Sequence, residues 1–404
     1  HAGEDRCGVR DARRNAVAEG FILEIPEQVG LPVPTGRKAQ AAGPEVLKPW
    51  PEGTVIISAD SHMLETDCWI DRFPEALRHK APRMIFKDGG WDLSIEGKST
   101  TPALIAAGLC EAMECYPGLT DVGVRLADLD IEGVEKELIF PQRLFGLLMF
   151  HEIEHRKEVF ESYNASIAEA CAKGNGRLFP VMVPSYWDPA AAADSVALCK
   201  SQGARCLLIP IKPGKFEDGG TILYNDPRMD PLWAAIEASG LPMAFHIGEA
   251  IPTAEAGAAG VMVLTQMQGF RHSWGQLVFG GVFDRFPGLK VVFVEGGLAW
   301  IPGMLHDADM IYNSFPTAMN PKLAHAPSWY WREHCYATFM TDPVGLEMLP
   351  RIGADRVMWS SDYPHQESTF GYSRSAIDAV FRATSVENAQ MILGKTALNL
   401  FNMH

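Results

Sequence analysis

The sequence predicts an α/β fold: a (β/α)8 TIM barrel with an N-terminal arm and a small insertion after the first strand. From residue 54 onward, eight short runs of β-forming residues alternate with longer helical stretches. The runs are apolar almost throughout, which is typical of parallel strands that helices cover on both faces. Eight strand-then-helix units in succession indicate a barrel.

The alternative fold is an open, doubly wound sheet. The nucleotide-binding form of that fold carries a Gly-x-Gly-x-x-Gly turn after its first strand. No such motif follows any of the eight runs, so the barrel is the better prediction. The expected strands cover residues 54–60, 135–141, 178–184, 205–211, 242–247, 290–295, 335–340 and 356–361.

Helical patterns fill most of the intervals between these strands. Residues 151–171 carry an apolar stripe at helical spacing, and residues 189–201 are rich in alanine. Residues 226–239 begin with an Asp-Pro start signal, and residues 274–286 end just before a proline. A last helix is expected over residues 385–401, where a serine stands at the capping position.

Two segments stand apart from this repeat. Residues 1–53 are charged and then rich in proline and glycine, and we expect an arm that contacts the barrel or a neighbouring subunit, with a disordered tail as the alternative. Residues 54–404 form the barrel domain. The long first crossover, about residues 61–133, contains a hairpin pattern around Gly89 and Gly90 and is read as an insertion at the barrel mouth.

Composition excludes several classes of function. The formal net charge is −15 and the isoelectric point is near 5.3, which argues against a nucleic-acid-binding surface. No apolar run is long enough to predict a transmembrane helix, and the first residues do not resemble a signal peptide. The eight cysteines form no Cys-x-x-Cys pair, so we expect reduced thiols in a cytoplasmic protein.

Polar residues of metal-binding type follow several strands. Asp60 and His62 lie two positions apart at the end of the first strand, so their side chains point the same way. His246, Glu295 and Asp362 end the fifth, sixth and eighth strands. Because the carboxyl ends of barrel strands meet at one rim, these imidazoles and carboxylates predict a divalent-metal site.

The chain resembles a known family at these same places. It is similar to the amidohydrolase superfamily, in the amidohydrolase-2 branch related to aminocarboxymuconate semialdehyde decarboxylase. The resemblance covers about residues 54–404, and its motifs occur in order along the barrel. They are residues 58–65 (SADSHMLE), 245–249 (FHIGE), 281–290 (GVFDRFPGLK), 294–300 (VEGGLAW), 359–365 (WSSDYPH) and 392–401 (ILGKTALNLF).

The resemblance implies one divalent metal ion held by Asp60, His62, His246 and Asp362. Zn²⁺ is the favoured ion, with Mn²⁺, Fe²⁺ and Co²⁺ as alternatives, because nitrogen and oxygen ligands suit all of them. The usual first ligand of the family is His or Glu. Here it is Asp60, which is one methylene shorter than Glu and binds either directly or through water.

Further residues are expected at the rim. Relatives commonly place a histidine where this chain has Glu295, so Glu295 is expected to act as a general base or to orient a ligand histidine. Asp362 and His272 are the other expected catalytic residues, and Arg143 and His365 are expected to bind substrate. Lys212 also raises the alternative of a carboxylated lysine that bridges two metal ions.

Three functions remain open on this evidence. The first is a metal-dependent hydrolase that uses a metal-activated water on an amide, ester or C–C bond of a small, aromatic molecule. The alternative is a non-oxidative decarboxylase of an aromatic or unsaturated carboxylic acid. The charge balance favours the first, because one like-charge contact with a carboxylate substrate costs roughly 3 kcal/mol at about 6 Å. The third is a barrel that only binds ligands. A homodimer or larger homo-oligomer is expected.

Overall fold

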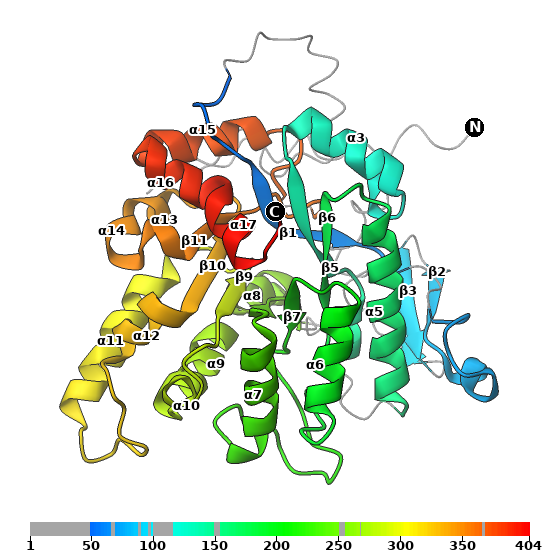
Figure 1. The fold of residues 1–404 in the computed structure, drawn as a ribbon, viewed down its shortest axis with the longest axis horizontal. Helices are drawn as coiled ribbons and strands as arrows, with labels where there is room; N and C mark the ends of the chain where they lie inside the picture. The colour runs from blue at the N-terminus through cyan, green and yellow to red at the C-terminus, as the bar shows by residue number, and fades with distance from the viewer. Residues whose placement is uncertain are drawn as a thin grey trace.

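Eight parallel strands form a nearly closed barrel, which confirms the predicted fold (Figure 1). The structure is a computed structural model that describes residues 49–65, 69–87, 90–95, 98–99, 116–148, 154–249, 255–266, 268–365 and 368–404. All eight predicted strands are present, in the predicted order around the barrel. They are β1 (Ile57–Met63), β5 (Lys136–Pro141), β6 (Leu178–Met182), β7 (Cys206–Leu208), β8 (Met243–His246), β9 (Val291–Val294), β10 (Cys335–Phe339) and β11 (Val357–Trp359).

Most of the helices lie around the barrel, whereas α8 lies near the centre of the view (Figure 1) and lines a cavity at the strand ends. They are α3 (Val122–Glu132), α4 (Leu144–Leu148), α5 (Arg156–Ala172), α6 (Ala192–Ser201), α7 (Asp230–Ser239), α8 (Ala258–Thr265), α9 (Gln268–Phe279), α10 (Val282–Arg285), α11 (Trp300–Ser314), α12 (Pro327–His334), α13 (Pro343–Glu347), α14 (Leu349–Ile352), α15 (Ser373–Ala383), α16 (Val386–Gln390) and α17 (Thr396–Leu400). Between α16 and α17 a π-helical turn, η7 (Met391–Lys395), continues the predicted last helix.

The predicted helix over residues 274–286 is displaced in the structure. Helix α9 begins at Gln268 and ends at Phe279, because Gly280 and Gly281 interrupt it and Gly281 adopts a positive φ of 65°. The short helix α10 then continues to Arg285. The earlier start of α9 matters for the site, since it changes the surroundings of His272.

The first and last strands close the barrel through a short seam. The amide of His62 donates to the carbonyl of Tyr363 at 2.7 Å, and the amide of Asp362 donates to the carbonyl of Asp60 at 3.0 Å. Ser58 Oγ accepts from the amide of Ser361, 303 positions along the chain, at 2.8 Å. The seam therefore joins β1 to β11 at the residues predicted to bind the metal.

The first crossover contains the predicted hairpin. Strands β2 (Arg83–Lys87) and β3 (Gly90–Ile95) pair antiparallel, and β4 (Lys98–Ser99) adds a third strand. This small sheet lies beside α5 (Figure 1), and the Trp69 indole donates to the carbonyl of Val159 in α5 at 2.9 Å. The predicted arm lies almost wholly outside the described residues. Among those residues, no helix combines the length and the apolar character that crossing a membrane requires.

Candidate metal centre at the strand ends

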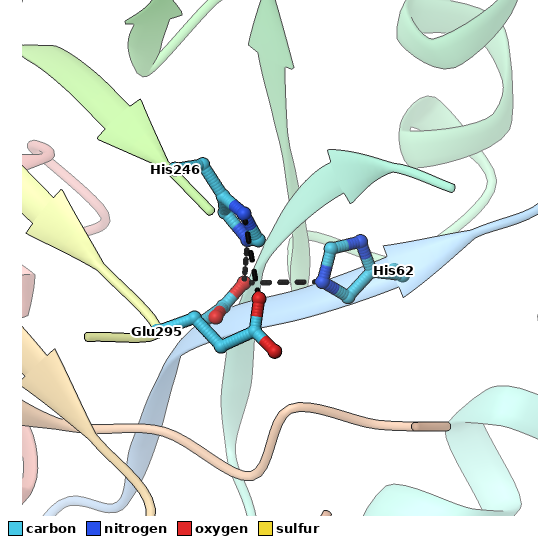
Figure 2. A group of neighbouring side chains, drawn as sticks. His62, His246 and Glu295 are labelled. Carbon is cyan, nitrogen blue, oxygen red and sulfur yellow. Dashed lines mark hydrogen bonds and ion pairs between the residues drawn. The ribbon is translucent and has the colours of Figure 1, made fainter. Parts of the chain in front are cut away.

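The barrel brings the ends of β1, β8, β9 and β11 together around one cluster of side chains. Figure 2 shows His62, His246 and Glu295, from the first three of these strand ends. Asp60 and His62 come from β1 and are fully buried, and His246 is the last residue of β8. Glu295 directly follows β9 and Asp362 lies three residues after the end of β11, with positive φ angles of 65° and 56°. Left-handed backbone is costly for residues other than glycine and clusters at functional sites. The backbone thus turns sharply at residues 295 and 362, the two positions after the strands from which a carboxylate enters the cluster.

Distances within the cluster are short. Asp60 Oδ1 lies 3.2 Å from His246 Nε2 and 3.5 Å from His62 Nε2. His62 Nε2 also lies 3.3 Å from Asp362 Oδ1. All of these side chains are at most 1% exposed. The sequence-predicted ligands therefore converge, although they come from residues as far apart as 60 and 362.

The protonation of His62 follows from its surroundings. Burial, and next the charge interaction with His365, hold the pKa of His62 well below its ordinary value, so its ring is neutral. His62 Nδ1 lies 2.7 Å from the carbonyl of Pro141, to which only an N–H can donate. The single ring proton is therefore on Nδ1. The lone pair of Nε2 faces the carboxylates of Asp60 and Asp362.

That arrangement fits a cation. Asp60 Oδ2, His62 Nε2 and Asp362 Oδ1 are buried and have no hydrogen-bond partner among the described residues. Buried polar atoms are nearly always paired in proteins, so such groups need an explanation. Imidazole nitrogens and carboxylate oxygens that converge in a buried space are the donor set of a divalent metal ion.

The donor atoms form two overlapping groups, within each of which they lie within 4.8 Å of one another. One group holds Asp60, His62, His246 and Glu295, and the other holds His62, Glu295, Asp362 and His365. Glu295 Oε2 lies 3.5 Å from His246 Nδ1, and Glu295 Oε1 lies 3.8 Å from His365 Nδ1. Glu295 is thus shared by both groups.

His365 was predicted to bind substrate, and in the structure its side chain lies against the cluster itself. Its Nδ1 lies 2.9 Å from Asp362 Oδ1, and its ring centroid lies 4.2 Å from that of His62. His365 is 17% exposed, unlike the fully buried Asp362. Gln142 Nε2 lies 3.1 Å from His365 Nε2. Gln142 was not among the predicted site residues, although its place directly after β5 was the available signal.

Two buried carboxylates near the rim hold loops and belong to neither group. Glu65 accepts from the amides of Gln142, Arg143 and Leu144 at 2.9, 2.7 and 3.1 Å. Glu249 accepts from the amides of Ile211 and Lys212 at 2.6 and 2.8 Å, and burial raises the pKa of Glu249 to about 7. Because these backbone amides carry the rim loops, both acids fix the loops around the site.

The remaining predicted residues lie around the cluster. Arg143 is buried at the end of β5, where its amide is bound by Glu65. Lys212 Nζ donates to the carbonyl of Glu249 at 2.9 Å. His272 is exposed on α9 and belongs to neither group of donor atoms.

An aromatic wall and a cavity adjoin the cluster. The ring centroids of Phe140 and Phe145 lie 4.8 and 4.7 Å from that of His246. A cavity of about 600 Å³ begins at Ile247, the residue after His246, and is lined by the ends of β7 and β8 and by α8. A space of this size accommodates a small organic molecule.

Comparison with known proteins decides the family. The family model described as amidohydrolase matches residues 67–403. The chain belongs to the amidohydrolase family. This amidohydrolase is therefore an enzyme of that superfamily, as the motifs predicted.

Individual relatives indicate the branch of the family to which this amidohydrolase is most similar. Gamma-resorcylate decarboxylase of Rhodococcus jostii (strain RHA1) is 27% identical over 303 residues, which are 69% of this chain and 87% of the relative. This relative confirms the predicted decarboxylase-related branch.

Solved structures confirm the fold. An amidohydrolase from Mycobacterium avium subsp. paratuberculosis K-10 superposes with a TM-score of 0.71 at 20% identity, over 87% of this chain and all of that one. A 5-carboxyvanillate decarboxylase from Novosphingobium aromaticivorans, solved with manganese and 4-hydroxy-3-methoxy-5-nitrobenzoic acid, gives a TM-score of 0.65 at 16% identity, over 87% and 96% of the two chains.

Glu295→Gln separates metal binding from chemistry at this site. We expect the variant to keep its metal, because Asp60, His62 and His246 remain, and to lose about 100-fold in kcat, the usual size of a lost acid–base or orienting group. Metal content by mass spectrometry and steady-state kinetics measure the two effects. Glu237→Gln is the control, because its carboxylate accepts the amide of Gly288 at the other end of the barrel. A loss of metal in Glu295→Gln would instead make Glu295 a ligand.

Proposed function

We propose that this amidohydrolase is a metal-dependent, non-oxidative decarboxylase of a small aromatic carboxylic acid. The observation that carries the proposal is the 27% identity to a gamma-resorcylate decarboxylase across 87% of that relative, together with the buried cluster of carboxylates and imidazoles. The relationship favours decarboxylation over the hydrolysis that the charge balance of the sequence had placed first.

The residues that would hold the metal are Asp60, His62, His246 and Asp362, the set implied by the sequence, with Glu295 in reach of the same atoms. A bound divalent ion would supply positive charge that attracts a carboxylate and an adjacent hydroxyl of the substrate. Mn²⁺ is the preferred candidate over Zn²⁺, because a decarboxylase of the same fold was solved with manganese.

Protonation of the ring is assigned to Asp362. Loss of CO₂ breaks the bond between the ring carbon and the carboxylate, and the electron pair left on that carbon takes up one proton. Asp362 donates it from a carboxyl oxygen. His365 Nδ1, which is hydrogen-bonded to Asp362 Oδ2 at 3.0 Å and partly exposed, returns a proton to Asp362 from the solvent side.

The surroundings favour this reaction over addition of water. Asp60, His62 and His246 are at most 1% exposed, and the rings of Phe140 and Phe145 face the imidazoles. A buried, aromatic wall suits a flat aromatic ring and the departure of apolar CO₂. The adjoining cavity of about 600 Å³ provides room for the rest of the substrate.

The test uses the enzyme loaded with Mn²⁺ and a panel of hydroxybenzoates that includes 2,6-dihydroxybenzoate and 5-carboxyvanillate. We expect at least one acid to release one CO₂ per aromatic product. In D₂O the product gains one deuterium at the carbon that carried the carboxylate. Heat-treated enzyme is the control for spontaneous decay. Absence of CO₂ from every acid, with ¹⁸O from water incorporated into an amide or ester substrate, would replace the proposal with the hydrolase.

A further inference from the structure

We infer that Arg125 is a positioning residue of the metal centre: its buried guanidinium fixes the seam between β1 and β11, on which His62 and Asp362 stand. The inference rests on the metal site of the proposed function. Arg125 lies on α3, outside the motifs that predicted the site, and touches none of the proposed donor atoms. Its influence is exerted through the backbone of His62 and the ring of Tyr363.

The guanidinium binds β1 directly behind the cluster. Arg125 is 1% exposed, and its Nη1 donates to the carbonyl of His62 at 2.6 Å. Its Nε donates to Glu137 Oε2 of β5 at 2.7 Å, and Glu137 is also 1% exposed. Charge-assisted hydrogen bonds are stronger than neutral ones. Arg125 thus ties the backbone of a proposed metal ligand to the neighbouring strand.

The same guanidinium also supports the other side of the seam. Its central carbon lies 4.7 Å from the ring centroid of Tyr363, the residue that follows Asp362. Tyr363 accepts from the amide of His62 through its carbonyl, and its hydroxyl donates to Asp128 Oδ2 at 2.9 Å. Arg125 therefore contacts both partners of the hydrogen bond that joins β1 to β11.

Close packing leaves this arrangement little freedom. Gly118 O accepts a longer bond from Arg125 Nη1, at 3.4 Å. A Cβ at position 118 would overlap the Tyr363 hydroxyl and lie 3.0 Å from Asp128 Oδ2. The residue at 118 must therefore lack a side chain for Tyr363 to reach Asp128, and Tyr363 is held in one place on the guanidinium.

A buried ion pair alone does not explain the arginine. Well-packed apolar residues often replace such a pair without loss of stability, whereas they cannot donate to the carbonyl of His62. The double variant Arg125→Met/Glu137→Leu exploits this difference, because it removes both charges and leaves neither partner buried alone. Arg125→Lys is the second variant, since it keeps the charge but its single ammonium lacks the fork that spans Glu137 and His62.

Arg177→Met is the matched control. The Arg177 guanidinium also binds two backbone carbonyls, those of Val134 and Glu135, and one carboxylate, that of Asp130. It does so just before β5, at the end of the barrel opposite the metal centre. If the loss of any guanidinium that binds backbone carbonyls were enough to change Mn²⁺ affinity, Arg177→Met would therefore change it as well.

In the experiment, Mn²⁺ is added to the metal-free wild type and to each metal-free variant. The affinity for Mn²⁺ and the paramagnetic resonance spectrum of the bound Mn²⁺ are then measured, and thermal melts establish that each protein is folded. We expect the dissociation constant to rise on the order of 10- to 100-fold in the double variant, as for other residues that orient metal ligands, and less in Arg125→Lys. We expect the spectrum to change in both variants. Arg177→Met keeps the wild-type affinity and spectrum.

Wild-type affinity and spectrum in a folded double variant or in folded Arg125→Lys would overturn the inference. If the double variant does not fold, Arg125→Lys decides alone. Failure of the wild type to bind Mn²⁺ would refute the proposed metal site itself. That result is seen in the wild type before any variant is compared, so the two failures are distinguishable.

Discussion

His246→Ala is expected to abolish metal binding and CO₂ release together. His246 Nε2 lies 3.2 Å from Asp60 Oδ1, and both side chains are at most 1% exposed, so alanine removes a nitrogen donor from the buried cluster. We expect bound Mn²⁺ to fall below stoichiometric levels and kcat/KM to fall at least about 1000-fold, which corresponds to about 4 kcal/mol. Metal analysis and CO₂ trapping measure the two quantities.

His334→Ala is the matched control for this change. His334 is equally buried and its Nδ1 lies 2.9 Å from the carbonyl of Leu289, but it stacks on Phe283 away from the strand ends. The control should lower thermal stability and leave the metal content unchanged. Stoichiometric metal and normal turnover in His246→Ala would remove His246 from the site.

Asp362→Asn is expected to cause the second large loss of activity, because it removes the group proposed to protonate the ring carbon of the substrate. The amide preserves the shape of the side chain but cannot deliver a proton to the ring carbon. It also removes one charged oxygen from the proposed set of metal donor atoms. We expect kcat to fall at least about 1000-fold, since general acid catalysis contributes 100- to 10,000-fold and a charged donor is lost as well. Single-turnover CO₂ release is the measurement.

Asp342→Asn tests whether any carboxylate at a strand end would behave in this way. Asp342 follows β10 and accepts from the amides of Leu298 and Gly345, with no part in either group of donor atoms. Asparagine caps a helix about as well as aspartate, so we expect little change in stability and intact turnover. Normal single-turnover release by Asp362→Asn would assign the proton to another group.

The sequence predicted the structure best in the barrel strands, where burial on both faces leaves a clear apolar pattern. Each barrel strand is covered on both faces, so its residues are mostly apolar, and all eight were predictable. The polar residue that ends such a run must lie at the rim. For that reason Asp60, His62, His246, Glu295 and Asp362 could be brought together without coordinates.

Residues on helices and loops lacked that constraint. His272 was expected near the site because it follows the long loop after the fifth strand. Helix α9 begins at Gln268, and His272 is exposed on it. Arg125 was missed because a buried arginine on a helix has the same sequence pattern as an exposed one. The contacts of the Arg125 guanidinium become visible only where β1 meets β11, and no local sequence pattern encodes the pairing of these distant strands.

The position of the seam links metal binding to the completion of the fold. The hydrogen bonds between Asp60 and Asp362, and between His62 and Tyr363, join segments from near the two ends of the barrel domain. A chain still being synthesised has no complete donor set until β11 has emerged and docked. An ion that binds only the closed barrel stabilises it by about 2.7 kcal/mol at 100 times its dissociation constant. A metal ion held by the proposed ligands Asp60, His62 and Asp362 would act as a reversible cross-link between the first and last strands, and a scarcity of the ion would loosen the barrel at the proposed site.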